Sequence, residues 1–329
     1  MRNPETIWNF LRKLSIPRLF GTEGHINSQR LIQETFSQIP NAQFETQTFP
    51  AKLRAKSPFE WISVIFIIIP LGLIFSYYIS WYAVAFALSI GVFLFALIFL
   101  PILGNRYRKR LHNEPAEMGT NYSLRFLPSQ KKEHTVVILA HYDSISTRFH
   151  IVLSALTFFG AYLFGYLFIL QNLIYNGRNV FFQATPLPWT HLAWGIGVSG
   201  LFFLRLLNRT QNQSPGTTDN ASGVAQIYDL ALFLSNNPLS KTEVILVATD
   251  AEELGNRGGH AFVEGHISDL PKASTDYIVV DTIGTPMNRV AVGSKFPHKH
   301  FSPRLEKIAE EVLGKDKYQI GRASCRERV

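Results

Sequence analysis

The longest uncharged stretch of the chain constrains its fold more than any other feature. No charged residue occurs from Trp61 to Leu103, a run of 43 residues. A helix needs about 20 apolar residues to cross a bilayer, so the run is long enough for two crossings. The polar and aromatic residues from Ser76 to Tyr82 are typical of an interfacial turn between them. A buried core helix is the alternative, but the length of the run favours a transmembrane hairpin over residues 58–104.

A second apolar region predicts another hairpin, over residues 149–208. Its first block covers about residues 151–170, and a weaker block covers about residues 189–207. We expect a loop between the blocks that contains Asn176-Gly177 and Pro186-Leu187-Pro188. Arg205 lies near the end of the last block, where its long side chain can reach the interface. Because the soluble segments must meet in one fold, each insertion returns to its starting side, and about four transmembrane helices are expected.

The basic residues beside the apolar blocks predict how the chain is oriented. Only Arg178 lies on the side away from the soluble segments, a bias that places the soluble part in the cytoplasm. The net charge of +8 has the same explanation, so we expect no binding to nucleic acid. The ten basic residues on the soluble side are Lys52, Arg54, Lys56, Arg106, Arg108, Lys109, Arg110, Arg148, Arg205 and Arg209.

Cysteine usage and the amino terminus agree with a reducing compartment. The single cysteine, Cys325, excludes an intramolecular disulfide and a zinc site built from cysteines. Residues 1–20 contain no apolar stretch long enough for a secretory signal. The sequence therefore predicts an integral membrane protein whose soluble part faces the cytoplasm.

Helix and strand patterns alternate in the three soluble segments, which are residues 1–57, 105–148 and 209–320. Residues 135–140, 243–248 and 277–280 are continuous apolar strands, and residues 223–234 have one apolar helical face. Strands buried on both faces favour a mainly parallel sheet covered by helices. The predicted fold class is α/β: a three-layer α/β/α sandwich with a mostly parallel mixed sheet, interrupted by the two hairpins.

Chemically active side chains cluster at the predicted strand ends and at one helix start. The carboxyl ends of strands are where α/β folds build their sites. The segments are His141-Tyr142-Asp143, Thr218-Asp219-Asn220, Asp250-Ala251-Glu252-Glu253 and Asp281-Thr282.

Each segment has a physical interpretation of its own. His141 can bind a metal while Asp143, on the same strand face, receives the other ring N–H. Glu252-Glu253 would repel each other unless a cation intervenes, and Asp281 ends a buried strand, where a lone carboxylate is costly. The alternatives are a surface histidine, a solvated loop and, for Asp219, a helix N-cap. Together, one imidazole and several carboxylates at one sheet edge favour a divalent-cation site.

The order of these segments resembles the co-catalytic di-zinc exopeptidases of the aminopeptidase Y and aminopeptidase S type, zinc metallopeptidases of the MH clan. That family also contains glutamate carboxypeptidase-like members. The motifs that carry the resemblance are HYDS, TDNASGVA, ATDAEELGNRGGHAF and VVDTIG, with PRLFGTEG near the amino terminus. The resemblance covers about residues 8–50, 106–147 and 213–300.

The resemblance implies a role for each candidate residue. Glu252 would be the general base in the hydrolysis of a peptide substrate by a metal-activated water, most often releasing amino-terminal residues. Asp143 would orient His141. Two zinc ions are implied, Asp219 bridging them, with the metal ligands His141, Asp219, Glu253 and Asp281.

This chain departs from the family pattern at two places. The family's last ligand is a histidine well downstream of Asp281, and His298 and His300 come too early to supply it. We therefore expect a carboxyl-terminal truncation, with residues 321–329 as a non-native tail. The spacing from Asp143 to Asp219 is long because the second hairpin occupies it.

Two other functions stay open at this point. One is a catalytically inactive membrane scaffold or receptor with a peptidase-like fold, although all four segments keep their polar residues. The other is a single-zinc enzyme like the glutaminyl cyclases, which resemble this family. The remaining histidines, His25 among them, show no ligand spacing. The expected partners are a peptide and the lipid bilayer, and the sequence does not determine the oligomeric state.

Overall fold

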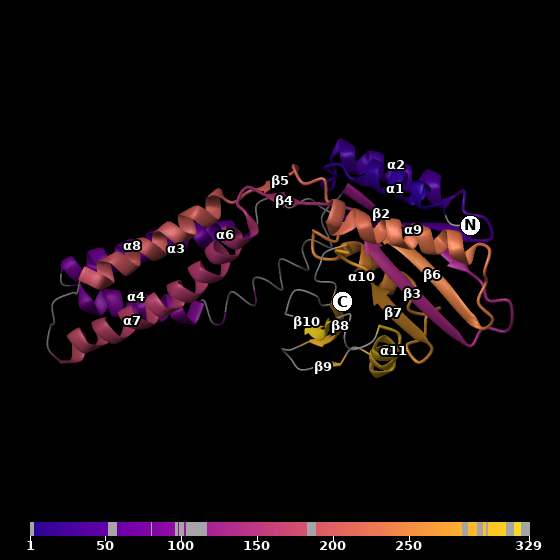
Figure 1. Cartoon of the computed structure of the whole chain (residues 1–329). Helices are drawn as coiled ribbons and strands as arrows, with labels where there is room; N and C mark the ends of the chain where they lie inside the picture. The colour runs from indigo at the N-terminus through magenta and orange to yellow at the C-terminus, as the bar shows by residue number, and fades with distance from the viewer. Residues whose placement is uncertain are drawn as a thin grey trace. The chain divides into compact units, whose positions relative to one another are not determined.

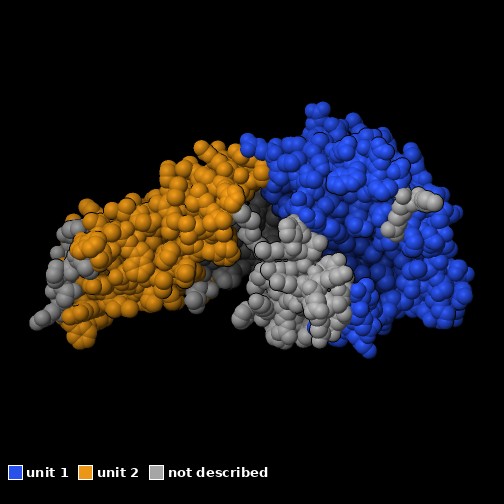
Figure 2. Space-filling view, viewed as in Figure 1, with its two compact units in different colours: residues 1–53, 116–145, 212–329 blue, residues 54–115, 146–211 orange. Residues whose placement is uncertain are grey.

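The computed structural model describes residues 3–51, 58–79, 81–95, 98, 102, 117–182, 189–284, 289–294, 299–300, 302–313 and 319–323. The chain divides into two compact units (Figure 2). Unit 1 consists of Met1–Leu53, Ala116–Ile145 and Asn212–Val329, and unit 2 consists of Arg54–Pro115 and Ser146–Gln211. The two apolar insertions predicted from the sequence, residues 58–104 and 149–208, fall within unit 2.

Five strands form the central sheet of unit 1, in the order β1-β2-β6-β3-β7 (Figure 1). Their bounds are Gln43–Ala51 for β1, Glu117–Phe126 for β2, His134–His141 for β3, Thr242–Thr249 for β6 and Thr275–Val279 for β7. β2 pairs antiparallel with both β1 and β6, whereas β3 lies parallel between β6 and β7. The α/β fold with a mixed, mostly parallel sheet is therefore confirmed.

Helices cover both faces of this sheet, which explains the continuous apolar run of β6. Val244, Leu246 and Ala248 share one core cluster with apolar residues of α1 (Pro4–Leu14), α2 (Glu23–Phe36) and α9 (Ser222–Leu234). Ile245 and Val247 point to the opposite face, where they pack with residues that include Phe262 of α10 (Arg257–Gly265). Because successive strand residues alternate between the faces, a strand covered on both sides is apolar throughout.

A small sheet follows the central one along the chain. β10 (Gln319–Ala323) lies parallel to β8 (Arg289–Ser294), and β9 (Lys299–His300) pairs antiparallel with β8. Helix α11 spans Pro303–Leu313. The boundary predicted for the non-native tail, at Gly321, falls inside β10, because the backbone pairing with β8 continues to Ala323. His298 and residues 324–329 lie outside the described residues, so the origin of the tail stays a prediction.

Unit 2 is a bundle of apolar helices. α3 (Pro58–Tyr78) packs on α8 (Trp189–Leu207), and α4 (Tyr82–Leu94) packs on α7 (Ala161–Phe181). α6 (Ile151–Ala155) and the π-helical turn η2 (Leu156–Gly160) lead directly into α7. β4 (Ser146–Thr147) and β5 (Thr210–Gln211) pair antiparallel, which brings the two ends of the second insertion together.

The expected loop does not include Asn176-Gly177, because α7 continues through this dipeptide to Phe181. The other part of the prediction, Pro186-Leu187-Pro188, lies outside the described residues. The side-chain amide of Asn172 donates to the carbonyl oxygen of Phe168, and that of Asn176 donates to the carbonyl oxygen of Asn172, each at 2.9 Å. These amides thus bond to the preceding turn of their own helix. A residue type that usually favours turns is accommodated in this way.

Two helical segments are long and apolar enough to cross a membrane by length and composition: Val152–Phe181 and Trp189–Leu207. The first insertion contributes two shorter apolar segments, Ser63–Ser76 within α3 and Tyr82–Leu94. Two of the four expected spans therefore meet this criterion, and both belong to the second insertion.

Candidate metal centre

Three side chains from distant parts of the sequence meet at the carboxyl edge of the parallel strands. His141 ends β3, and the backbone N–H of Val280 donates to the carbonyl oxygen of Leu139, which brings Asp281 to the same edge. The Nε2 atom of His141 lies 3.1 Å from Oδ1 of Asp219 and 3.6 Å from Oδ1 of Asp281. One ligand atom from each of the three residues lies within 4.8 Å of the others. This donor set is suited to a divalent cation such as zinc.

Asp219 reaches this group from the turn that begins α9. Asn220, and not Asp219, makes the hydrogen bond typical of a helix N-cap: its Oδ1 accepts from the backbone N–H of Gly223 at 3.0 Å. The Nδ2 atom of Asn220 donates to the carbonyl oxygen of Val280 at 2.8 Å. Asn220, which the sequence did not single out, therefore ties the start of α9 to the strand end before Asp281 and leaves Asp219 facing His141.

The second ring nitrogen of His141 faces Asp143. Nδ1 of His141 lies 3.4 Å from Oδ1 of Asp143 and 3.2 Å from its carbonyl oxygen. The Asp143 carboxylate accepts the backbone N–H groups of Glu252 and Glu253, each at 3.0 Å. Burial opposes its ionisation, but His141 and these two donors keep the pKa of Asp143 below its ordinary value. This arrangement leaves Nε2 of His141 directed at the two exposed carboxylates.

Carboxylates also crowd the imidazole from the turn after β6. Burial and the charges of Asp143, Asp219 and Glu252 raise the pKa of Glu253 to about 8, against the opposing effect of His141. Burial also raises the pKa of Glu252. Both side chains are half-buried, which differs from the solvated loop considered as an alternative. Glu253 does not belong to the compact group of His141, Asp219 and Asp281 among the described residues.

A bound cation would relieve this crowding of negative charge. Although burial disfavours charge on His141, hydrogen bonds with Asp143, Asp219 and Asp281 raise its pKa well above the ordinary value. A proton on the imidazole thus provides the positive charge that the carboxylates require when no metal is present. The residues fit a divalent cation, and His141, Asp219 and Asp281 are the side chains placed to hold it.

A hydrogen-bonded pair that the sequence did not indicate holds the turn that carries the two glutamates. Nε2 of His25 donates to Oδ1 of Asp250 at 2.8 Å, since Nδ1 of the same ring accepts from the backbone N–H of Gly21. The carboxylate of Asp250 also accepts from the backbone N–H of Ala251 at 2.7 Å. Ala251 has φ +54, a conformation that non-glycine residues adopt at a cost. The contact spans 225 residues of sequence, so no local pattern signals it.

Comparisons with known proteins agree with the fold and with the chemistry of these residues. The family model described as Peptidase family M28 matches residues 202–325, which include Asp219, Glu252, Glu253 and Asp281. That family consists of zinc peptidases, and His141 and Asp143 precede the matched region. No curated protein matches the chain.

Solved structures are similar to this chain at low sequence identity. A glutaminyl cyclase from an Acidobacteriales bacterium has a TM-score of 0.51 and 14% identity, with 99% of this chain and 73% of that one covered. A leucine aminopeptidase precursor from Bacteroides thetaiotaomicron has a TM-score of 0.49 and 12% identity, with coverage of 98% and 78%. A zinc aminopeptidase from Bacillus subtilis has 19% identity, coverage of 63% and 36%, and a TM-score of 0.36. The likeness to the glutaminyl cyclase with the TM-score of 0.51 shows a common fold and no more.

Metal binding should release protons and should strengthen as the pH rises. The raised pKa values keep His141, and Glu253 with its pKa of about 8, protonated at pH 7 in the metal-free protein. A metal ligand must be deprotonated, so below these pKa values the apparent affinity should increase by up to about tenfold per pH unit for each proton released. Calorimetric titration of Zn²⁺ at pH 7 in buffers of different ionisation enthalpy measures this release. A binding enthalpy that is the same in every buffer would contradict the expectation.

Replacing Asp250 by asparagine should destabilise unit 1. Oδ1 of Asp250 accepts from His25 and Ala251, and Oδ2 accepts from Thr120 N–H at 3.0 Å and Gln29 Nε2 at 3.3 Å. Either orientation of the amide would set its NH₂ group against two donors in a fully buried site. We expect Asp250→Asn to cost about 3 kcal/mol of unfolding free energy, measured by denaturant titration.

The matched control is Asp269→Asn. Asp269 is exposed and accepts from the hydroxyl of the neighbouring Ser268 at 3.1 Å. Its replacement should change the unfolding free energy by less than about 0.5 kcal/mol. Equal effects of the two substitutions would show that the Asp250 hydrogen bonds do not stabilise the turn.

Proposed function

We propose that the chain is a membrane-anchored, zinc-dependent exopeptidase that removes amino-terminal residues from peptides. The observation that supports this most is the convergence of His141, Asp219 and Asp281, in a chain whose later part matches a zinc peptidase family. Two zinc ions would be held by His141, Asp219, Glu253 and Asp281. When bound, zinc supplies Lewis acidity at the scissile carbonyl and acidifies water near neutral pH.

Glu252 is the general base of the proposed reaction. Its carboxylate takes a proton from the attacking water and returns it to the leaving amine. Burial raises the pKa of Glu252, with the neighbouring carboxylates adding to the effect and His141 opposing it. A carboxylate with a raised pKa exchanges protons more readily near neutral pH than an ordinary one. Asp143 keeps His141 oriented through the contact of 3.4 Å between Nδ1 and Oδ1.

A glutaminyl cyclase activity is the second candidate. The compact group contains three protein ligands, which suits a single cation with an open position. The solved structure with a TM-score of 0.51 is a glutaminyl cyclase, although its 14% identity supports only the fold. Release of amine from an aminoacyl amide indicates the peptidase, whereas cyclisation of an amino-terminal glutamine indicates the cyclase. A protein active in neither assay would favour the inactive scaffold.

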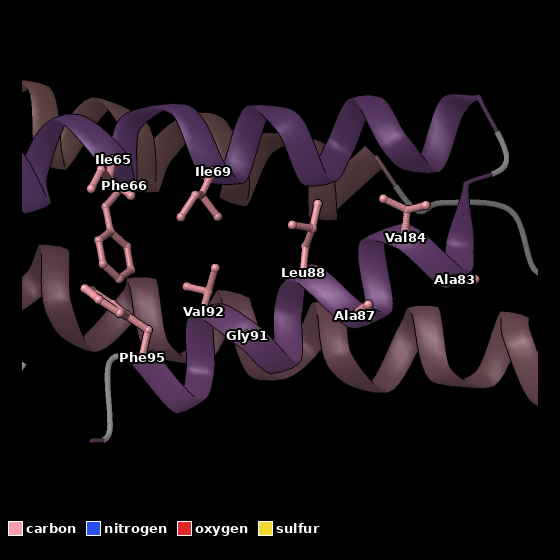
Figure 3. Close-up of a pocket in the computed structure, with 10 residues that line it drawn as sticks. All are labelled: Ile65, Phe66, Ile69, Ala83, Val84, Ala87, Leu88, Gly91, Val92 and Phe95. Atoms are coloured by element: carbon pink, nitrogen blue, oxygen red, sulfur yellow. The ribbon is translucent and has the colours of Figure 1, made fainter. Parts of the chain in front are cut away.

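The surface of unit 2 supports anchoring in a membrane with four spans. Most of the large hydrophobic side chains that are exposed among the described residues belong to this unit, for example Ile68, Phe75 and Phe181. An apolar surface of this extent is costly in water. The bundle also has an open groove between α3 and α4 (Figure 3), lined by Ile65, Phe66, Ile69, Ala83, Val84, Ala87, Leu88, Gly91, Val92 and Phe95. The distribution of basic residues supports a cytoplasmic location for unit 1.

Glu252→Gln should strongly reduce turnover and leave the zinc content unchanged. The amide keeps the size of the side chain but cannot accept the proton, so we expect kcat to fall by about 10²- to 10⁴-fold. Hydrolysis of aminoacyl amides and elemental analysis measure the two quantities. The control is Glu264→Gln, which replaces an exposed glutamate on α10. A Glu252→Gln protein as fast as its parent would remove the general-base assignment.

A reporter inserted between Phe182 and Trp189 should report the non-cytoplasmic side. The insertion site lies between the two helical segments that meet the length and composition criterion for a membrane span. The same reporter inserted in the exposed Asn236–Leu239 segment of unit 1 should report the cytoplasm. Cytoplasmic signal from both positions would overturn the proposed second hairpin.

A further inference from the structure

Arg18 is a fully buried cation in unit 1, with 0% of its surface exposed. Burial lowers the pKa of Arg18 to about 10, and the charges of Asp143 and Asp219 oppose this shift, so the guanidinium stays charged at neutral pH. Burying a charge is costly unless its hydrogen bonds are made. Its guanidinium donates to backbone carbonyl oxygens, those of Leu14, Ile16, Tyr142, Pro215 and Gly216.

These acceptors belong to three separate chain segments. Leu14 and Ile16 lie in the amino-terminal segment, at 2.9 and 3.1 Å from Nη1. Tyr142 lies between His141 and Asp143 in the segment that follows β3. Gly216, whose carbonyl oxygen lies 2.7 Å from Nη2, precedes Asp219 by three residues. One side chain therefore connects the backbone next to His141 with the backbone that leads to Asp219.

The backbone of Arg18 strengthens the same connection. Its N–H donates to Oγ of Ser144 at 3.1 Å, and its carbonyl oxygen accepts from the N–H of Ser144 at 3.2 Å. Residues 146–211, which separate the His141 segment from the Asp219 segment in sequence, belong to unit 2. The peptide chain thus leaves unit 1 between these two segments, and Arg18 holds them together within it.

The environment of Gly216 shows how closely Arg18 packs against the segment that leads to Asp219. Its φ of +55 lies in the left-handed region. A Cβ atom at this position would lie 2.5 Å from Cβ of Ser144 and 2.9 Å from Nη2 of Arg18. The turn that presents Asp219 therefore packs directly against the guanidinium, and a displacement of either would move the other.

We propose that Arg18 is a positioning residue for the metal centre, which fixes the separation of the His141 segment from the Asp219 turn. Its planar fork reaches several carbonyl groups at once, which a lysine ammonium on a flexible stem does not reproduce. The inference rests on the proposed function, because it assigns Arg18 to the cation site of His141 and Asp219. Groups that orient metal ligands typically contribute about 10- to 100-fold to metal affinity.

The test measures Co²⁺ binding to the full-length chain without any substrate. Arg18→Lys keeps the charge but loses the fork, so we expect its Co²⁺ affinity to fall by about 10- to 100-fold, with an altered visible absorption spectrum of the bound ion. The matched control is Arg125→Lys. Arg125 lies on β2, where Nη1 contacts Oε1 of Glu243 at 3.3 Å near the amino end of β6, away from the metal edge. This control should bind Co²⁺ within about twofold of the parent chain.

A second variant keeps the proposal testable if Arg18→Lys does not fold. Gly216→Ala leaves Arg18 in place but introduces the Cβ that clashes with its guanidinium, so it should also weaken Co²⁺ binding and change the spectrum. Parent-like affinity and spectrum in a folded Arg18→Lys, or in Gly216→Ala, would overturn the positioning role, even if thermal stability fell. A parent chain that binds no Co²⁺ would instead overturn the proposed function and this inference with it.

Discussion

The parallel pairing of β3 with β6 and β7 is the constraint on which the candidate site depends. The register sets His141 beside Thr249, and the hydrogen bond from Val280 to Leu139 extends the pairing toward Asp281. Asp143 then accepts the backbone N–H groups that follow β6. Main-chain hydrogen bonds therefore place an imidazole and several carboxylates at one edge before any contact between their side chains is considered.

Burial and repulsion between carboxylates destabilise the ionised side chains at this edge of the sheet, and the same crowding of negative charge favours the binding of a cation. The pKa of Glu253 rises to about 8 because the turn is half-buried and other carboxylates lie near it. Arg18 carries a compensating charge, but its fork bonds to backbone carbonyl oxygens and not to the ligands themselves. The ligand carboxylates thus keep their capacity for a cation. Local conflicts of this kind are expected where a fold serves a function.

Local sequence patterns predicted much of the fold and the candidate ligand residues. They did not predict the long-range contacts that hold these residues in place. Continuous apolar runs such as residues 243–248 predict strands that helices cover on both faces. The polar residues that follow such strands are then expected at one edge of the sheet. The contacts of Arg18 with Tyr142 and of His25 with Asp250 span more than a hundred residues, so they exist only once the sheet has formed. Asn220 makes the N-cap hydrogen bond that was considered as the alternative role of Asp219, and Asn176 lies in a helix where a loop was expected. Asn220 is also held by a tertiary contact, its hydrogen bond to the carbonyl oxygen of Val280, whereas the amide of Asn176 bonds within its own helix.

The pairing of β4 with β5 has a consequence for biosynthesis. Ribosomes release the His141 segment first, then the whole apolar stretch that ends at β5, and only afterwards the turn of Asp219. The proposed cation site therefore cannot be complete before the hydrophobic helices have been made, because a nascent chain halted earlier lacks the Asp219 turn. The order of synthesis itself delays the assembly of the proposed metal centre.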